Sequence, residues 1–263
     1  MSGNDGGGGM SGNPELKAAE EVMPANTARL FQEIRDSPLL GSFTLIGGTA
    51  LSLHIGHRLS EDLDFITLLP KLPRAALKEL ERLLERSGHI ITHQVNLDAY
   101  DDFQTAGLEL ADSQQDWMVD GAVKLTFFSA EPQHAKLLNQ SQAGIETEPL
   151  FKIASFQELC QLKATVTASR SKSRDWLDLY LLERDYQFGM ADWKKAFDLA
   201  GLTPMQFEIA LKRMCEGQLS EGDEGFSTLL PNAPTVKEMQ IKFKALRYEY
   251  ESALAKIHVI KKT

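Results

Sequence analysis

The stretch that most constrains the fold is residues 45–65, which read LIGGTALSLHIGHRLSEDLDF. The apolar residues 43–46 predict a short strand that ends at two glycines, and glycine permits a tight turn and a close approach to a ligand. Residues 49–57 have a helical composition, and residues 62–66 alternate polar and apolar side chains, the period of a half-buried strand. The stretch therefore predicts a strand, a glycine turn, one short helix and a second strand in direct succession.

This order of elements also predicts a chemistry. A helix that begins after the two glycines, with Thr49 in its first turn, presents free N–H groups and a positive potential that suit a phosphate. Asp62 and Asp64 are two residues apart on the predicted strand, so both side chains lie on one face. Asp-x-Asp alone is common on solvated strands, but two carboxylates beside a phosphate cradle form a site for a hard divalent cation. Phosphoryl and nucleotidyl transfer require such a site.

A second block concentrates positive charge in a chain whose formal net charge is −9. Its cations are Lys163, Arg170, Lys172 and Arg174. Lys163 and Arg170 are seven residues apart and share one helix face if the helix that starts at Ser155 persists that far. Lysine and arginine side chains of this kind bind a triphosphate or an RNA backbone. The alternative is a solvated helix face whose cations pair with Asp175 and Asp178.

The two blocks resemble known proteins. Gly48-Thr49, twelve further residues and then Asp62-Leu-Asp64 resemble the signature of the DNA polymerase β-like nucleotidyltransferase superfamily. The fuller texts GGTAL and HRLSEDLDF resemble the AbiEii/AbiGii toxin family more narrowly. The second block, with Lys163, Arg170 and the text RDWLDL, is similar to the lysine, arginine and RDxxDL elements of that family.

The pattern of elements predicts an α+β chain. Residues 14–150 are expected to form a domain with a mixed sheet, including a hairpin that turns at Asp120-Gly121, and the resemblance implies a polymerase β-like nucleotidyltransferase fold for it. Residues 151–263 are nearly all helical in pattern and form the predicted C-terminal domain. Residues 1–13 are glycine-rich and are predicted to be a disordered tail.

The candidate site residues follow from the two blocks and from the resemblance. Those expected to be catalytic are Asp62, Asp64, Lys163 and Asp175, of which Asp62 and Asp64 bind Mg²⁺ or Mn²⁺. Those expected to bind the nucleotide are Gly47, Gly48, Thr49, Lys163 and Arg170. Those expected to support the site are Arg58, Ser60, Arg174 and Asp178. Asp175 is interpreted either as a general base or as a group that orients a basic side chain.

One departure from the superfamily pattern concerns a third carboxylate. Polymerase β-like enzymes carry it on a later strand, which places it near Thr126, and no acidic residue stands there. Asp120 falls in the predicted turn and is not assigned to the site. Two interpretations remain open: a metal site of two carboxylates completed by substrate oxygens, or a protein with weakened catalysis.

The resemblance implies that the protein moves an NMP from an NTP to a tRNA-like RNA or a protein hydroxyl. It would be the toxin of a toxin–antitoxin or phage-defence pair, with a cognate antitoxin. The alternatives are a small-molecule nucleotidyltransferase of the antibiotic-resistance type and a non-catalytic nucleotide-binding protein. No apolar run is long enough to span a membrane, and Cys160 and Cys215 fit a reducing cytoplasm, so a cytoplasmic protein without a membrane partner is expected.

Overall fold

The computed structural model describes residues 15–95, 100, 103–138 and 150–260. The glycine-rich segment 1–13, predicted to be disordered, lies outside this set. Within the described residues no helix combines the length and the apolar character needed to cross a membrane.

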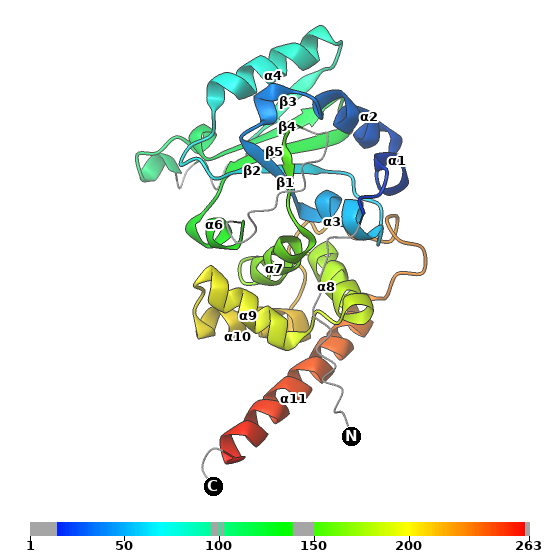
Figure 1. The fold of residues 1–263 in the computed structure, drawn as a ribbon, viewed down its shortest axis with the longest axis vertical. Helices are drawn as coiled ribbons and strands as arrows, with labels where there is room; N and C mark the ends of the chain where they lie inside the picture. Colours follow the sequence, from blue (N-terminus) through cyan, green and yellow to red (C-terminus); the bar gives the residue numbers. More distant parts are fainter. Residues whose placement is uncertain (1–14, 96–99, 101–102, 139–149, 261–263) are drawn as a thin grey trace, which may run out of the picture.

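A six-stranded mixed sheet forms the upper half of the molecule in Figure 1. Its strands lie in the order β3 (Ile91–Gln94), β4 (Gln114–Val119), β5 (Val123–Ser129), β2 (Leu63–Thr67), β1 (Phe43–Ile46) and β6 (Lys152–Ile153). The pairs β2/β5 and β1/β6 are parallel and the others are antiparallel. The predicted hairpin is confirmed, since β4 and β5 pair as far as Val119 and Val123, and Asp120 and Gly121 in the turn between them both have positive φ, 54° and 64°.

The sheet has one core face and one face that borders the helical half. Alternation along the strands puts Phe43, Phe65, Trp117 and Phe127 on the core face, where they are fully buried. The Phe65 and Phe127 rings stack with centroids 5.5 Å apart. Helix α4 (Arg74–Arg86) lies on the side of the sheet away from the helical half (Figure 1) and buries Leu77, Leu80 and Leu84. The opposite face is left for polar side chains.

Short helices complete the N-terminal half. They are α1 (Ala19–Val22), α2 (Ala25–Ile34), α3 (Gly47–Ile55), α6 (Pro132–Leu138) and the 3₁₀ turns η1 (Pro38–Leu40) and η2 (Leu110–Asp112). Pro24 separates α1 from α2, as the sequence predicts, because proline is accepted only at the start of a helix. Helix α6 is not expected from the sequence.

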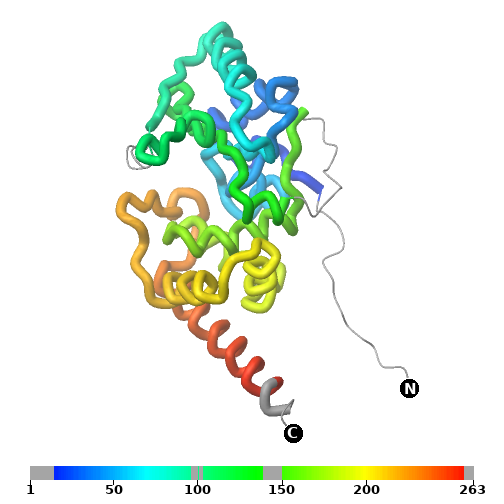
Figure 2. Tube along the Cα trace, turned by 90° about the vertical axis from the view of Figure 1, so that its left-hand side faces the viewer, coloured from blue at the N-terminus to red at the C-terminus, as the bar shows by residue number. Residues whose placement is uncertain are grey.

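The C-terminal half is helical, as predicted. Its helices are α7 (Phe156–Val166), α8 (Ser173–Tyr186), α9 (Met190–Ala200), α10 (Pro204–Glu216) and α11 (Val236–Ile260). The capping box at Ser155 and Glu158 opens α7, and Thr203 caps α10 with Pro204 in its first turn. Helix α7 packs against α3, α6, α8 and α9 and so joins the two halves. Helix α11 extends away from the body toward the C-terminus (Figure 2).

The structure corrects three boundaries. Helix α3 begins at Gly47 and ends at Ile55, because Gly56 adopts the left-handed conformation (φ 60°), so His57 lies after the helix and not on it. Strand β2 begins at Leu63, so Asp62 immediately precedes the strand on which it is expected. Helix α7 ends at Val166, so Arg170 does not continue the helix face of Lys163. Strand β6 pairs with β1 just beyond residue 150, and the division of the chain into two domains at that residue stays a prediction.

Candidate active site

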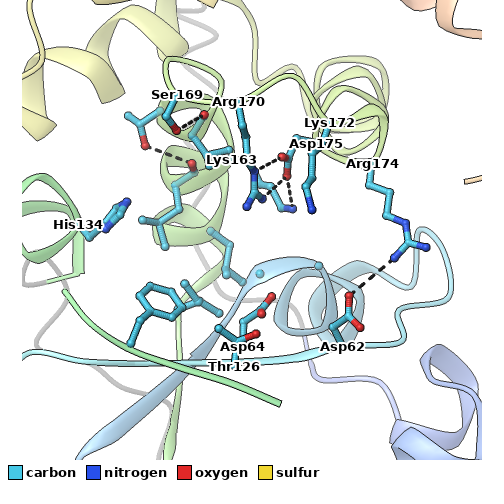
Figure 3. Close-up of a pocket in the computed structure, with 18 of the residues that line it drawn as sticks. Asp62, Asp64, Thr126, His134, Lys163, Ser169, Arg170, Lys172, Arg174 and Asp175 are labelled. Carbon is cyan, nitrogen blue, oxygen red and sulfur yellow. Dashed lines mark hydrogen bonds and ion pairs between the residues drawn. The ribbon is translucent and has the colours of Figure 1, made fainter. Parts of the chain in front are cut away.

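A cleft of about 510 Å³ lies between the polar face of the sheet and the helices α7 and α8 (Figure 3). This volume falls within the usual range for a small-molecule site. Both sequence blocks line it: Gly47, Gly48, Asp62 and Asp64 from the sheet side, and the cationic block around Lys163 from the helical side. Residues about a hundred positions apart in the chain therefore face one another across one cavity.

The two glycines are required by what packs against them. Gly47 has φ +79°, a left-handed conformation that L side chains rarely adopt, and a Cβ there would collide with the Asp64 carboxylate. A Cβ on Gly48 would collide with the Arg58 guanidinium and press on the Ser60 hydroxyl. The turn thus brings the first amides of α3 directly against Asp64, at the end of the helix that carries positive potential.

Asp62 and Asp64 both line the cleft, and both carboxylates hold their protons more tightly than usual. The pKa of Asp62 is raised to about 6, first by burial and then by the neighbouring Asp64 and Glu224, whose effect exceeds that of Arg174 and Lys124 in the opposite direction. Burial also raises the pKa of Asp64, although Arg170 and Lys163 across the cleft oppose the shift. Two carboxylates that are costly to ionise side by side are stabilised by a divalent cation.

Thr49 is placed differently from the other glycine-turn residues. Its side chain is buried and its hydroxyl donates a hydrogen bond to the carbonyl oxygen of Asp62. It is absent from the lining of the cleft, whereas Gly47 and Gly48 are part of it. The hydroxyl of Thr49 therefore fixes the position of the Asp62 backbone, and nucleotide binding by this residue stays a prediction that concerns its amide alone.

Asp178 is the centre of a buried ion network beneath the cleft. It accepts hydrogen bonds from Arg58 Nε at 2.7 Å and from Arg58 Nη2 at 3.2 Å, and it lies 2.7 Å from Lys163 Nζ and 2.8 Å from His57 Nε2. Burial raises the pKa of Asp178, but Arg58 and Lys163 outweigh it and hold that pKa well below its usual range. Burial lowers the pKa of His57, which favours the neutral imidazole. The predicted supporting residues Arg58 and Asp178 thus bind each other across 120 positions.

Asp175 links this network to the surface of the cleft. Its Oδ1 lies 3.0 Å from Lys163 Nζ, and its Oδ2 accepts from Arg170 Nε at 2.7 Å. Burial raises the pKa of Asp175, but the two cations prevail and lower it to about 2. Lys163 is buried between Asp175 and Asp178, whereas the Arg170 side chain is 47% exposed. Of the two cations, Arg170 is the one more accessible from the cleft.

Arg174 bridges the two walls of the cleft at its outer end. It lies 2.9 Å from a Glu61 carboxylate oxygen, 3.1 Å from Glu224 and 3.8 Å from Asp62 Oδ2, and its Nε donates to the Gly225 carbonyl (Figure 3 draws the Asp62 contact). The acidic loop before α11 therefore reaches the site through Glu224, a residue not expected from the sequence. The predicted supporting residue Ser60 also lines the cleft, beneath Gly48.

A carboxylate that the sequence interpretation missed lies on β4. Thr126 pairs with Asp64 on one side and with Asp116 on the other, so all three side chains share one face of the sheet. The Thr126 hydroxyl donates to Asp116 at 3.0 Å, and Gln114 and Lys124 hold the same carboxylate at 2.7 and 3.5 Å. Asp120 lies in the hairpin turn and bonds His89 instead. Three residues, 120–122, separate the paired residues Val119 and Val123, and this register places Asp116 opposite Thr126.

A glycine turn that presents a helix N-terminus to paired carboxylates, with cations across the cleft, is the arrangement found in nucleotidyltransferases, and this protein is one. It belongs to the AbiEii family, since the family model described as "Nucleotidyl transferase AbiEii toxin, Type IV TA system" matches residues 29–247.

Solved structures with a similar course of the chain are also found. JHP933 from Helicobacter pylori is 17% identical over 90% of this chain and 97% of its own, with a TM-score of 0.45. MenT4, a nucleotidyltransferase toxin from Mycobacterium tuberculosis, is 15% identical over 87% of this chain and 86% of its own, with a TM-score of 0.41. No curated protein sequence matches this chain.

Proposed function

We propose that this protein transfers an NMP from an NTP to an RNA or protein acceptor, with Mg²⁺ or Mn²⁺ held by Asp62 and Asp64. One observation carries the proposal: two carboxylates with raised pKa values line one wall of a cleft whose other wall presents Arg170 and Lys172. The first wall attracts a cation and the second attracts an anion. A metal–triphosphate complex carries both.

The donor set suits a hard cation, because carboxylate oxygens are the ligands that Mg²⁺ and Mn²⁺ prefer. Among the described residues no three His, Cys, Asp or Glu side chains form a metal site by themselves. This agrees with a two-carboxylate site that is completed by phosphate oxygens and water, as Mg²⁺ sites commonly are. When bound, the metal neutralises the triphosphate and the leaving pyrophosphate.

The remaining work falls to side chains and amides of the chain itself. The amides of Gly47 and Gly48 at the start of α3 bind phosphate oxygens, helped by the positive end of the helix. The Arg170 guanidinium offers the fork that a phosphate takes in two hydrogen bonds. Asp175, with a pKa of about 2, is a poor proton acceptor, so we assign it the role of orienting Arg170 and Lys163. Lys163 then acts through Asp175 and as a buried positive charge.

In the cell, we propose the role of a toxin that is controlled by a cognate antitoxin, in keeping with the type IV toxin family. An RNA acceptor agrees with the cations that border the cleft, although the net charge of −9 confines such binding to this region.

The test is incubation of the purified protein with each α-labelled NTP, Mg²⁺ or Mn²⁺, and either total RNA or total protein. We expect one macromolecular fraction to become labelled, and Asp64→Asn to abolish the label. Asp36→Asn is the matched control, because the Asp36 side chain is 74% exposed and lies outside the cleft. Label that appears only in a small molecule would move the protein to the antibiotic-type class, and pyrophosphate release with no labelled product of any kind would refute transfer.

A further inference from the structure

We infer that the end of the cleft beside α6 binds the nucleobase of the NTP, with Phe128 as the stacking surface and His134 as the group that contacts the edge of the base. This inference rests on the proposed function, since it places the base relative to a triphosphate at Asp62 and Asp64. It adds a substrate subsite and its two recognition residues.

The cleft changes character along β5. Alternate residues of this strand, Lys124, Thr126 and Phe128, line the cleft, because side chains two apart share a face. Thr126 is level with Asp64 in the parallel pair of β2 and β5, and Phe128 is level with Ile66 one step further along. One end of the cleft is thus charged and the other presents an aromatic ring.

The opposite wall changes in the same direction. Leu162 and Val166, one turn apart on α7, line the cleft, and Leu202 lines it from the start of the segment before α10. Helix α6 packs on α7 and α9 through the buried Leu137, and it places His134 on the lining of this end. In Figure 3 His134 lies at the far side of the pocket from Asp62 and Arg174.

One ring nitrogen of His134 is available for a hydrogen bond with a ligand. Its Nδ1 is buried and has no hydrogen-bond partner among the described residues, so within this part of the chain no group fixes the protonation of that nitrogen. Burial lowers the pKa of His134 and prevails over Glu131, which raises it, while Arg170 lowers it slightly further, so the neutral imidazole is favoured. A neutral imidazole offers one donor and one acceptor, the same mixture that the edge of a nucleobase presents.

The chemistry of an NTP matches this division. The triphosphate is strongly anionic and is disfavoured at the end beside α6, where Phe128, Leu162 and Val166 solvate it poorly and the lining residue Glu131 repels it. The base is a flat ring that stacks on aromatic side chains and hydrogen-bonds only at its edge. A single orientation therefore satisfies both ends of the cleft: phosphates toward Asp62 and Asp64, base toward Phe128 and His134.

The experiment compares binding of each NTP with binding of inorganic tripolyphosphate, both with Mg²⁺, by calorimetry on the full chain. Wild-type protein is expected to bind at least one NTP about tenfold more tightly than tripolyphosphate, since the base adds its own contacts. Phe128→Leu keeps an apolar side chain but removes the ring, and we expect it to weaken NTP binding about tenfold while the affinity for tripolyphosphate stays within twofold. His134→Ala is expected to change the rank order of the four NTPs.

The matched controls are Tyr248→Leu and His93→Ala. Tyr248 is 74% exposed on α11 and His93 lies on the edge strand β3, so neither change should alter binding of either ligand. If wild-type protein binds every NTP no more tightly than tripolyphosphate, or if Phe128→Leu weakens both ligands equally, the inference is overturned and the phosphate site stands. If NTPs and nucleosides bind and tripolyphosphate does not, the base subsite is supported and the proposed metal–triphosphate site fails.

Discussion

Replacement of Asp178 by asparagine tests the buried ion network most directly. The Asp178 carboxylate is fully buried and lies 2.7 Å from both Arg58 Nε and Lys163 Nζ. Asparagine keeps the size of the side chain and one acceptor for Arg58, but it removes the negative charge. It also turns an amide donor toward the Lys163 ammonium, which itself only donates.

The size of the expected loss of stability follows from the cations that keep their charge after the Asp178 carboxylate is removed. Removing one partner of a buried ion pair costs about 3–5 kcal/mol, because the remaining charge stays in a poorly solvated place. Here two cations lose the same partner, although Asp175 still neutralises Lys163 at 3.0 Å, so we expect a loss of about 3–5 kcal/mol in the free energy of unfolding. Domains are typically stable by about 5–15 kcal/mol, so the variant should still fold but with a clearly lower stability.

Urea unfolding of the ligand-free protein at pH 7 measures this loss. Asp198→Asn is the matched control, because Asp198 pairs with Lys194 on an exposed helix surface where the two side chains are 60% and 29% exposed, and such pairs contribute less than about 0.5 kcal/mol. Because the pKa of folded Asp178 is lowered, its contribution is present above the unfolded value near 3.8 and is lost as the pH falls below it, so the two proteins should converge in acid. A loss below about 1 kcal/mol at pH 7, or a difference that does not shrink in acid, would refute the network as a source of stability.

Three further outcomes are expected for residues on the sheet side of the cleft. Asp62→Asn should abolish transfer but raise the stability of the ligand-free protein at pH 7 by about 1 kcal/mol in thermal or urea unfolding. The shift of the Asp62 pKa from 3.8 to about 6 corresponds to about 3 kcal/mol, and solvent screening reduces this figure because the side chain is 39% exposed. The pKa of Asp62 also predicts that Mn²⁺ affinity, measured by calorimetry, falls as the pH drops through about 6, because protons then compete for the site. A Mn²⁺ affinity that does not change between pH 7 and pH 5 would contradict this. Gly47→Ala, at φ +79° and against Asp64, should cost at least about 1 kcal/mol of stability and lower Mn²⁺ affinity, whereas Gly88→Ala, also at positive φ but with open space around its Cβ, should cost stability only.

The parts of the site that the sequence predicts are those that local rules specify. The strand, the glycine turn, the helix and the second strand follow one another within about twenty residues. Asp64 on β2 and Asp62 immediately before it both line the cleft, as their two-residue spacing predicts. The capping boxes of α7 and α11 are predictable for the same reason, since each is completed within four residues.

What the sequence does not predict depends on contacts between distant segments. The sequence around Arg58 indicates only a role close to that residue. Its hydrogen bond to Asp178 exists because helix α8 packs below α3 in the folded chain. Helix α6 is a short segment whose stability comes from burying Leu137 against α7 and α9. Its sequence is too short to show a helical period of apolar residues that would predict it. Asp116 is an intermediate case: the predicted turn brings its strand beside β5, but its place opposite Thr126 depends on one extra residue, Ala122, between the paired residues Val119 and Val123.

Four aspartates in and beneath the cleft form two pairs that differ in their charged neighbours. Asp175 and Asp178 lie among Lys163, Arg58 and Arg170, which lower the pKa of each carboxyl, so their charge is already neutralised by protein cations. Asp62 and Asp64 lie on the sheet side, where burial outweighs the cations that reach them and raises both pKa values. A divalent cation that enters the cleft gains more from the second pair than from the first, because only there does it relieve an uncompensated cost. If the proposed metal site is correct, the network around Asp178 serves it indirectly: Arg58, Lys163 and Arg170 already neutralise Asp175 and Asp178, and the uncompensated carboxylates are Asp62 and Asp64.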